Sequence, residues 1–117
     1  MSMSDKAKNR AANAIIAVQA SLHSGDPGAD GAANELPTAG GIYSRKPTNY
    51  GAAVAGKRSL PADILFDTPP GSSVSHYVIW DEDGDVVKIG QFAKTETYSG
   101  QGQHKIKAIG SELTVNG

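Results

Sequence analysis

The segment that most constrains the fold is residues 73–92, which read SVSHYVIWDEDGDVVKIGQF. β-Branched and aromatic residues lie on both sides of an acidic run that contains Gly84. Strand-forming residues around an Asp-Gly turn are the strongest short-range signal for a β-hairpin. The segment therefore predicts the central hairpin of an antiparallel sheet.

The rest of the chain reads as further short strands separated by Gly- and Pro-rich turns. Period-two alternation starts near residue 17, as in Val18, Ala20 and Leu22, and returns toward the C-terminus. Short strands at regular spacing are typical of sandwiches and small barrels. Outside the central hairpin, we expect strands at residues 17–23, 42–46, 60–66, 95–98, 104–109 and 113–115. The predicted fold is mainly β, an antiparallel β-sandwich of seven or eight short strands.

One short N-terminal α-helix is predicted over residues 4–16. Ser4 can cap it, and Ala11, Ile15 and Val18 follow the i, i+4 and i+7 spacing of one narrow apolar stripe. The alanine-rich composition also favours helix.

The chain is therefore expected to have two parts, an N-terminal helical arm (1–17) and a β-sandwich domain (18–117). An isolated helix of this length is marginal in water and needs a surface to pack on. We expect that surface to belong to a neighbouring subunit, which makes Ile15 a candidate assembly residue.

Residues 24–41 form a long segment rich in Gly, Pro, Asp and Asn. In its Asp26-Pro27-Gly28 sequence, proline presets φ and glycine supplies a positive φ, which predicts a turn. A flexible linker here would leave residues 1–23 too short to fold alone. We therefore expect an ordered surface loop.

Two side chains that flank this loop are expected to order it. His23 can hydrogen-bond backbone groups of the loop, and Arg45 can bind Asp26, Glu35 or backbone carbonyls. None of the three histidines lies within a local ligand spacing of another, and the chain contains no cysteine. Structural roles are therefore expected for them.

Composition narrows the function classes. The chain has 117 residues, 11 basic against 12 acidic, and a net charge of −1, so it is one domain without the basic excess that nucleic-acid binding needs. No apolar run approaches the ~20 residues that cross a bilayer, and no signal peptide is expected. Neither a serine-nucleophile elbow nor a phosphate-binding loop occurs. We expect no enzyme activity, cofactor, nucleic acid partner or membrane insertion.

The acidic run offers one metal hypothesis. Asp81, Asp83 and Asp85 alternate as the first ligands of a calcium loop do, but an EF-hand needs glycine at position six and glutamate at position twelve. This chain has valine and phenylalanine there. We expect a solvated hairpin tip and no required metal, with a weak calcium site at the three aspartates as the alternative.

Aromatic residues leave a second alternative open. Tyr43, Tyr50, Tyr77, Trp80 and Tyr98 can fill a core or a subunit contact, or line a carbohydrate groove. An outward-facing cluster would favour glycan binding and an inward-facing set a structural role.

The order of motifs along the chain resembles a known family. The residues concerned are SLHSGDPG at 21–28, Gly31, Asn34-Glu35 and GGIYSR at 40–45. They are similar to a family of small tailed-phage virion proteins that read SLHTxDPGxxGxNE followed by GGxYxR. Later parts of the pattern are met by Phe66, Pro69-Pro70-Gly71, residues 74–81 and Gly84.

This resemblance implies a non-enzymatic virion structural protein that acts through contacts with other virion proteins. Members of such families occur in tail tips, fibres and capsid surfaces. We expect a minor tail protein near the tail tip or baseplate, assembled in the host cytoplasm and located in the virion. A homo-oligomer is expected, with a trimer as the candidate. The alternatives are a capsid decoration protein and a carbohydrate-binding module that contacts the host surface.

Overall fold

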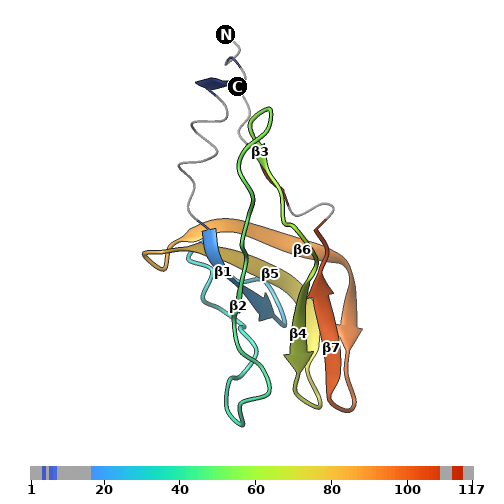
Figure 1. Ribbon diagram of the computed structural model, residues 1–117. Coiled ribbons are helices and arrows are strands. Elements are labelled where there is room, and N and C mark those ends of the chain that lie inside the picture. Colours follow the sequence, from blue (N-terminus) through green and yellow to red (C-terminus); the bar gives the residue numbers. More distant parts are fainter. Residues whose placement is uncertain (1–3, 5, 8–16, 109–111, 115–117) are drawn as a thin grey trace.

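The computed structural model describes Ser4, Lys6, Ala7, residues 17–108 and residues 112–114 (Figure 1). The described residues are mainly β. Their strands are β1 (Ala17–His23), β2 (Lys46–Pro47), β3 (Lys57–Arg58), β4 (Ile64–Thr68), β5 (Ser73–Asp81), β6 (Val86–Thr97), β7 (Gly102–Ile106) and β8 (Leu113–Thr114).

The largest layer is an antiparallel sheet with the strand order β2-β1-β5-β6. Along β1, Ala20 and Leu22 face one side of this sheet while Ser21 and His23 face the other. All four are fully buried. The inner strand β1 is therefore covered on both faces, one apolar and one polar.

The predicted central hairpin is present as β5 and β6. Asp81 N donates to Asp85 O at 2.9 Å, and Gly84 adopts φ +81°, which closes the turn where the sequence placed it. The second strand is longer than predicted, because β6 runs on through the segment expected as a separate strand at 95–98.

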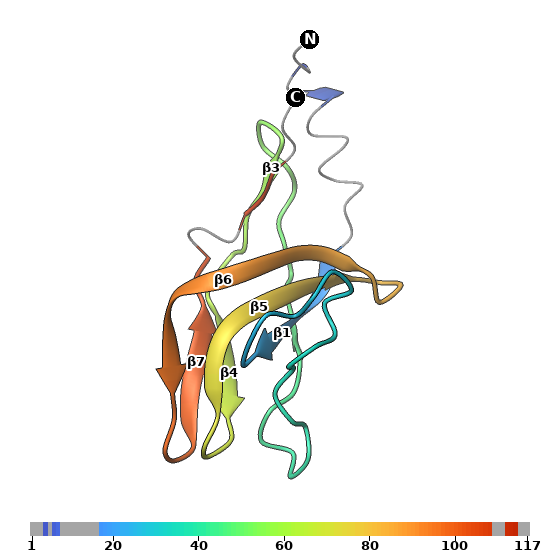
Figure 2. The ribbon, with the colours of Figure 1, turned by 180° about the vertical axis from the view of Figure 1, so that it is seen from behind.

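A smaller layer lies against the apolar face of this sheet. It is the antiparallel pair β4–β7, in which Phe66 faces His104 and Ile64 faces Ile106. Phe66 and Ile106 join Leu22, Tyr77 and Ile79 in one buried apolar cluster. The predicted mainly β, antiparallel fold is confirmed. The strands are divided unequally among the four-stranded sheet, the β4–β7 pair and the two-stranded β3–β8 ribbon. This ribbon projects from the end of the molecule opposite the loops that follow β4 and β6 (Figure 2).

Several predicted strand bounds are wrong. The strand expected at 60–66 is β4, shifted toward the C-terminus, and that expected at 104–109 ends earlier, as β7. The largest error concerns residues 42–46, of which only Lys46 belongs to a strand, together with Pro47. Here the Tyr43 side chain replaces a backbone ladder, because its hydroxyl accepts a hydrogen bond from Leu22 N at 3.0 Å.

The predicted N-terminal helix over residues 4–16 lies almost entirely outside the described residues, and the structure does not support it. Of this segment, Ser4, Lys6 and Ala7 are described, and Ala7 N donates to Ser4 Oγ at 3.2 Å. Within the part of the chain that can be described, no helix has the length and apolar character to span a membrane.

Candidate functional site

The loop at residues 24–41 is held by its own polar groups. Asp26 Oδ1 accepts a hydrogen bond from Gly28 N at 2.9 Å, which forms the predicted turn. Asn34, at φ 62°, donates from Nδ2 to Asp26 O at 3.0 Å, and its own carbonyl accepts from Ser24 N at 2.8 Å. The loop is thus an ordered part of the domain that covers the polar face of the sheet.

Gly31 is the point at which this loop touches the sheet. It adopts φ +73°, and a Cβ at this position would lie 2.5 Å from Val86 Cγ2 and 3.1 Å from Trp80 Cη2. Any side chain here would therefore collide with the hairpin, apart from the cost of a positive φ. Glycine at this position lets the loop backbone close over Trp80.

A chain of buried hydrogen bonds runs beneath the loop. Trp80 Nε1 donates to Ser21 Oγ at 2.8 Å, and Ser21 Oγ lies 2.7 Å from His23 Nε2. His23 Nδ1 lies 2.8 Å from Ala33 O, and because a carbonyl can only accept, Nδ1 carries the proton. Nε2 is then free to accept from the Ser21 hydroxyl. Burial lowers the pKa of His23, in keeping with this neutral tautomer, although the Ala33 carbonyl opposes the shift.

An ion pair holds the far end of the same loop. Arg45 donates from Nη2 to Glu35 Oε1 at 2.8 Å and from Nε to Glu35 Oε2 at 3.0 Å, a two-point contact. The Tyr43 hydroxyl also donates to Glu35 Oε2 at 2.8 Å. Burial alone would raise the pKa of Glu35, but the hydrogen bonds from Arg45 and Tyr43 outweigh it and lower the pKa.

The guanidinium of Arg45 also lies over the Trp80 ring, 4.3 Å from its centroid. Ser21, His23, Glu35, Arg45 and Trp80 are hereafter called the Trp80 cluster. The structure places the sequence candidates His23 and Arg45 in it, and Asp26 in the loop that covers it. The fourth candidate, Ile15, lies outside the described residues.

The acidic hairpin tip brings the three candidate aspartates together. Asp81, Asp83 and Asp85 each offer a carboxylate oxygen within 4.8 Å of the others. However, Asp81 Oδ1 already accepts hydrogen bonds from Asp83 N at 2.9 Å and Asp85 N at 2.8 Å. These bonds account for the aspartate at position 81 as a turn residue, and the expectation that no metal is required stays a prediction.

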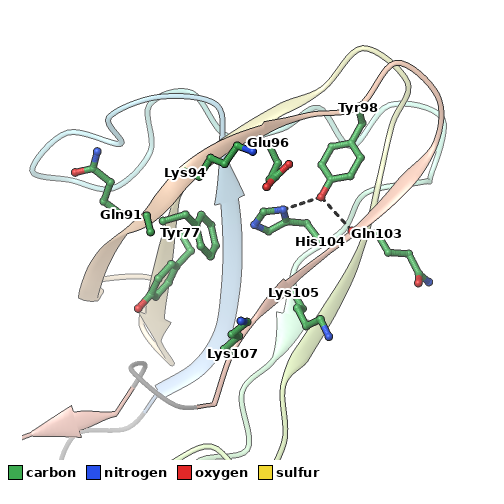
Figure 3. A pocket seen from close by; sticks show the side chains of 11 residues that line it. Tyr77, Gln91, Lys94, Glu96, Tyr98, Gln103, His104, Lys105 and Lys107 are labelled. Atoms are coloured by element: carbon green, nitrogen blue, oxygen red, sulfur yellow. Dashed lines mark hydrogen bonds between the residues drawn. The ribbon is translucent and has the colours of Figure 1, made fainter.

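A groove of about 650 Å³ lies between β6 and β7 (Figure 3). Four aromatic side chains line it: Tyr77, Phe92, Tyr98 and His104. Three lysines also line it: Lys94, Lys105 and Lys107. Of the aromatic residues weighed for a sugar site, Tyr43, Tyr50, Tyr77 and Trp80 are buried, and Tyr98 is half-buried. Tyr77 and Tyr98 line the groove, Tyr77 from the edge of the core.

Sequence reasoning missed most of the groove. Phe92, Lys94 and His104 lie on two strands that the chain order separates, and no short motif marks them. The one available signal was the alternation expected over residues 104–109, which places Lys105 and Lys107 together on one face.

The Ser21–His23 contact has the length of a nucleophile–base pair, but its surroundings differ. Both residues are fully buried, and a backbone carbonyl, rather than a carboxylate, orients the imidazole. The pair serves as part of the hydrogen-bonded support under the loop.

Comparison with known proteins identifies the family. A search of curated proteins found no match. A family model described as podophage GP4 fiber I protein gp80 matches residues 3–114, which is nearly the whole chain. The sequence-based resemblance to phage virion structural proteins is confirmed at this level. The chain belongs to the podophage GP4 fiber I protein gp80 family and is a phage structural protein, a component of the virion.

Proposed function

We propose that the chain is a non-enzymatic subunit of a phage tail appendage, a minor tail protein near the tail tip, that acts through contacts with other virion proteins. The observation that carries this proposal is that the motif shared with the phage family, residues 21–45, serves to hold the domain together. Its polar residues His23, Glu35 and Arg45 bond to one another and to the loop, under or beside Trp80. Such a motif builds a rigid domain, which suits a structural part.

The tail location rests on the family description, which names a fiber protein. A fiber is an appendage, whereas a decoration protein covers the capsid lattice, and this supports the tail over the capsid. Assembly in the host cytoplasm follows from the same role.

Residues 1–17 are proposed as an assembly arm, joined to a β domain at 18–117. Two observations support this division. The inner strand β1 begins at Ala17, so the sheet starts at the boundary between the proposed arm and the β domain. At the other end of the arm, the bond from Ala7 N to Ser4 Oγ is the local contact expected at a helix start. We propose that this arm joins copies of the chain, with a trimer as the closed arrangement.

The test uses Ile15→Asp in the full chain, with Thr95→Asp as the matched control on the exposed part of β6. Native mass spectrometry should give three times the 12.1 kDa chain mass for the parent and the control, and a monomer for Ile15→Asp. Incorporation into particles should fall in parallel, with an unchanged melting temperature. A folded Ile15→Asp protein that still assembles and incorporates would refute the arm. Unfolding of this variant, or of a chain that starts at Ala17, would assign the segment to its own core.

A further inference from the structure

The β6–β7 groove exists because β6 bends. Val74 faces Glu96 across the hairpin, whereas His76, two residues further on, faces Gln91, five residues earlier on β6. The additional residues on β6 form a bulge, and a bulge turns its strand and redirects its side chains. Phe92 and Lys94 lie in this bulge and line the groove, which is therefore part of the fold rather than a gap between loose loops.

The floor of the groove is a connected aromatic surface. The rings of Tyr77 and Phe92 have centroids 5.3 Å apart, and Phe92 meets His104 edge to face at 4.5 Å. Tyr77 itself lies over Gly90, where a Cβ would come within 2.1 Å of the ring. Phe92 and Tyr98 are half-buried, so apolar ring surface reaches solvent here.

The polar groups around this floor are mostly cationic. The lining residues include three exposed lysines and one exposed glutamate, Glu96, so positive charge is in excess. Gln91 and Gln103 contribute amide groups. Burial lowers the pKa of His104, although Glu96 opposes the shift, so the imidazole is neutral near pH 7.

His104 presents a defined acceptor. The Tyr98 hydroxyl donates to Gln103 O at 3.0 Å and lies 2.8 Å from His104 Nδ1. Because that hydroxyl proton is used, Nδ1 carries a hydrogen and Nε2 is the acceptor. Among the described residues, no hydrogen bond reaches Nε2.

Addition of a peptide strand is disfavoured at this site. A strand entering the groove would pair with the open edge of β7. Tyr98 already occupies that edge, since its ring packs on Gly102 and its hydroxyl donates a hydrogen bond to the Gln103 carbonyl. The groove therefore suits a ligand that contacts ring faces and side-chain groups rather than a backbone ladder.

We propose that the β6–β7 groove binds an acidic saccharide. Sugar rings place their C–H faces on the half-buried rings of Phe92 and Tyr98. A carboxylate or other anionic substituent pairs with Lys105 and Lys107, and a hydroxyl donates to His104 Nε2. Aromatic walls with a few polar groups that fix orientation are the usual composition of small-ligand sites. This activity is additional to the structural role and does not depend on the assembly arm.

The experiment titrates the full-length protein with trigalacturonic acid, with its neutral counterpart galactotriose, and with hexaglutamate, by isothermal calorimetry and amide NMR. Trigalacturonic acid should bind saturably and shift amides of β6 and β7. The double variant Lys105→Gln/Lys107→Gln should weaken binding by about tenfold, because two exposed charge pairs together contribute enough for that factor. The matched double variant Lys46→Gln/Lys57→Gln, which changes the same charge outside the groove, should bind as the parent does.

Phe92→Ala provides a second readout for the aromatic floor, and its folding is checked by circular dichroism. The lysine variants carry the test if Phe92→Ala does not fold, since their side chains are exposed. Three outcomes overturn the proposal: absence of trigalacturonic acid binding at about 10 mM, equal binding of galactotriose, or equal weakening by the two double variants. Tighter binding of hexaglutamate would identify an acidic peptide as the occupant and would likewise overturn it.

Discussion

The Trp80 cluster and the β6–β7 groove lie on opposite sides of one hairpin. Trp80 and Tyr77 come from the same strand, β5, and alternate between its faces. On one side a loop closes over the tryptophan and leaves it 4% exposed. On the other side Tyr77 is nearly as buried, at 6% exposed, but the bend in β6 leaves the groove lysines exposed and Phe92 and Tyr98 half-buried.

This difference explains where sequence motifs occur in the chain. A closed loop needs particular backbone conformations, so it requires Gly31 at a positive φ and a turn at Asp26. The groove needs glycine only where a ring packs on the backbone, at Gly90 under Tyr77 and Gly102 under Tyr98, and neither position has a positive φ. The motif-rich region of this chain is therefore the part that builds the domain, and the motif-poor region is the part that remains available for binding.

The largest loss of stability is expected when a ring of the Trp80 cluster is removed, and a smaller loss when a ring of the groove is removed. Trp80→Ala removes a buried ring and leaves Ser21 without its donor, so the free energy of unfolding should fall by about 3–5 kcal/mol. Phe92→Ala in the half-buried groove should cost about half as much. Urea unfolding monitored by circular dichroism measures both. Equal losses would mean that the groove is as much a part of the core as the Trp80 cluster.

The next effect concerns the closeness of the loop to the sheet. Gly31→Ala combines a positive φ with overpacking against Val86, and should cost about 2–4 kcal/mol. The matched control is Gly84→Ala at φ +81°, where nothing lies within 4 Å of the added Cβ, and only the backbone cost of about 1 kcal/mol should appear. Thermal melting of the two variants gives the difference; a similar melting temperature for both would contradict the contact at Gly31.

A smaller loss of stability is expected when a charged carboxylate is replaced by a neutral amide. Glu35→Gln loses the two-point ion pair with Arg45, which is partly exposed to solvent, so about 1–2 kcal/mol should be lost at pH 7. Glu96→Gln in the groove serves as the control. Glu96 is exposed, and its replacement should stay within about 0.5 kcal/mol. Urea midpoints at low salt test this pair, and a larger loss for Glu96 would reverse the comparison.

The smallest expected effect is a pH dependence of folding stability, to which one histidine of the Trp80 cluster and one of the groove both contribute. The pKa values of His23 and His104 are lowered in the folded state, so below pH 6.5 the unfolded chain binds more protons than the folded one. Their contribution is present above pH 6.5 and is lost as the pH falls through the lowered values. Glu35, whose pKa is also lowered, adds a second loss that begins below pH 4.5.

Urea midpoints between pH 7.5 and pH 4 test this order of events. His23→Gln and His104→Gln should each remove part of the first decline, and Glu35→Gln should reduce the second. Stability that rises as the pH falls from 7.5 to 5.5 would show that protonated imidazoles are favoured in the folded state, contrary to their buried positions.

The sequence by itself determined the central hairpin, its turn and the antiparallel, mainly β class. These depend on neighbours in the chain: alternating strand formers in β5 and a glycine at the turn suffice. It also indicated that residues 24–41 are ordered, because a flexible linker there would leave residues 1–23 too short to fold alone. The predicted helix over residues 4–16 rests on the sequence alone.

Only the tertiary structure decided which partners these residues meet. The strand expected at 42–46 is mostly absent because a side-chain bond from Tyr43 to the edge of β1 replaces a ladder. The extension of β6 to Thr97 depends on pairing with the start of β5, since its last residues are exposed and carry no apolar alternation. The Trp80 cluster and the groove join residues far apart in the chain. Their contacts follow from sheet order and strand bending, which local residue preferences do not specify.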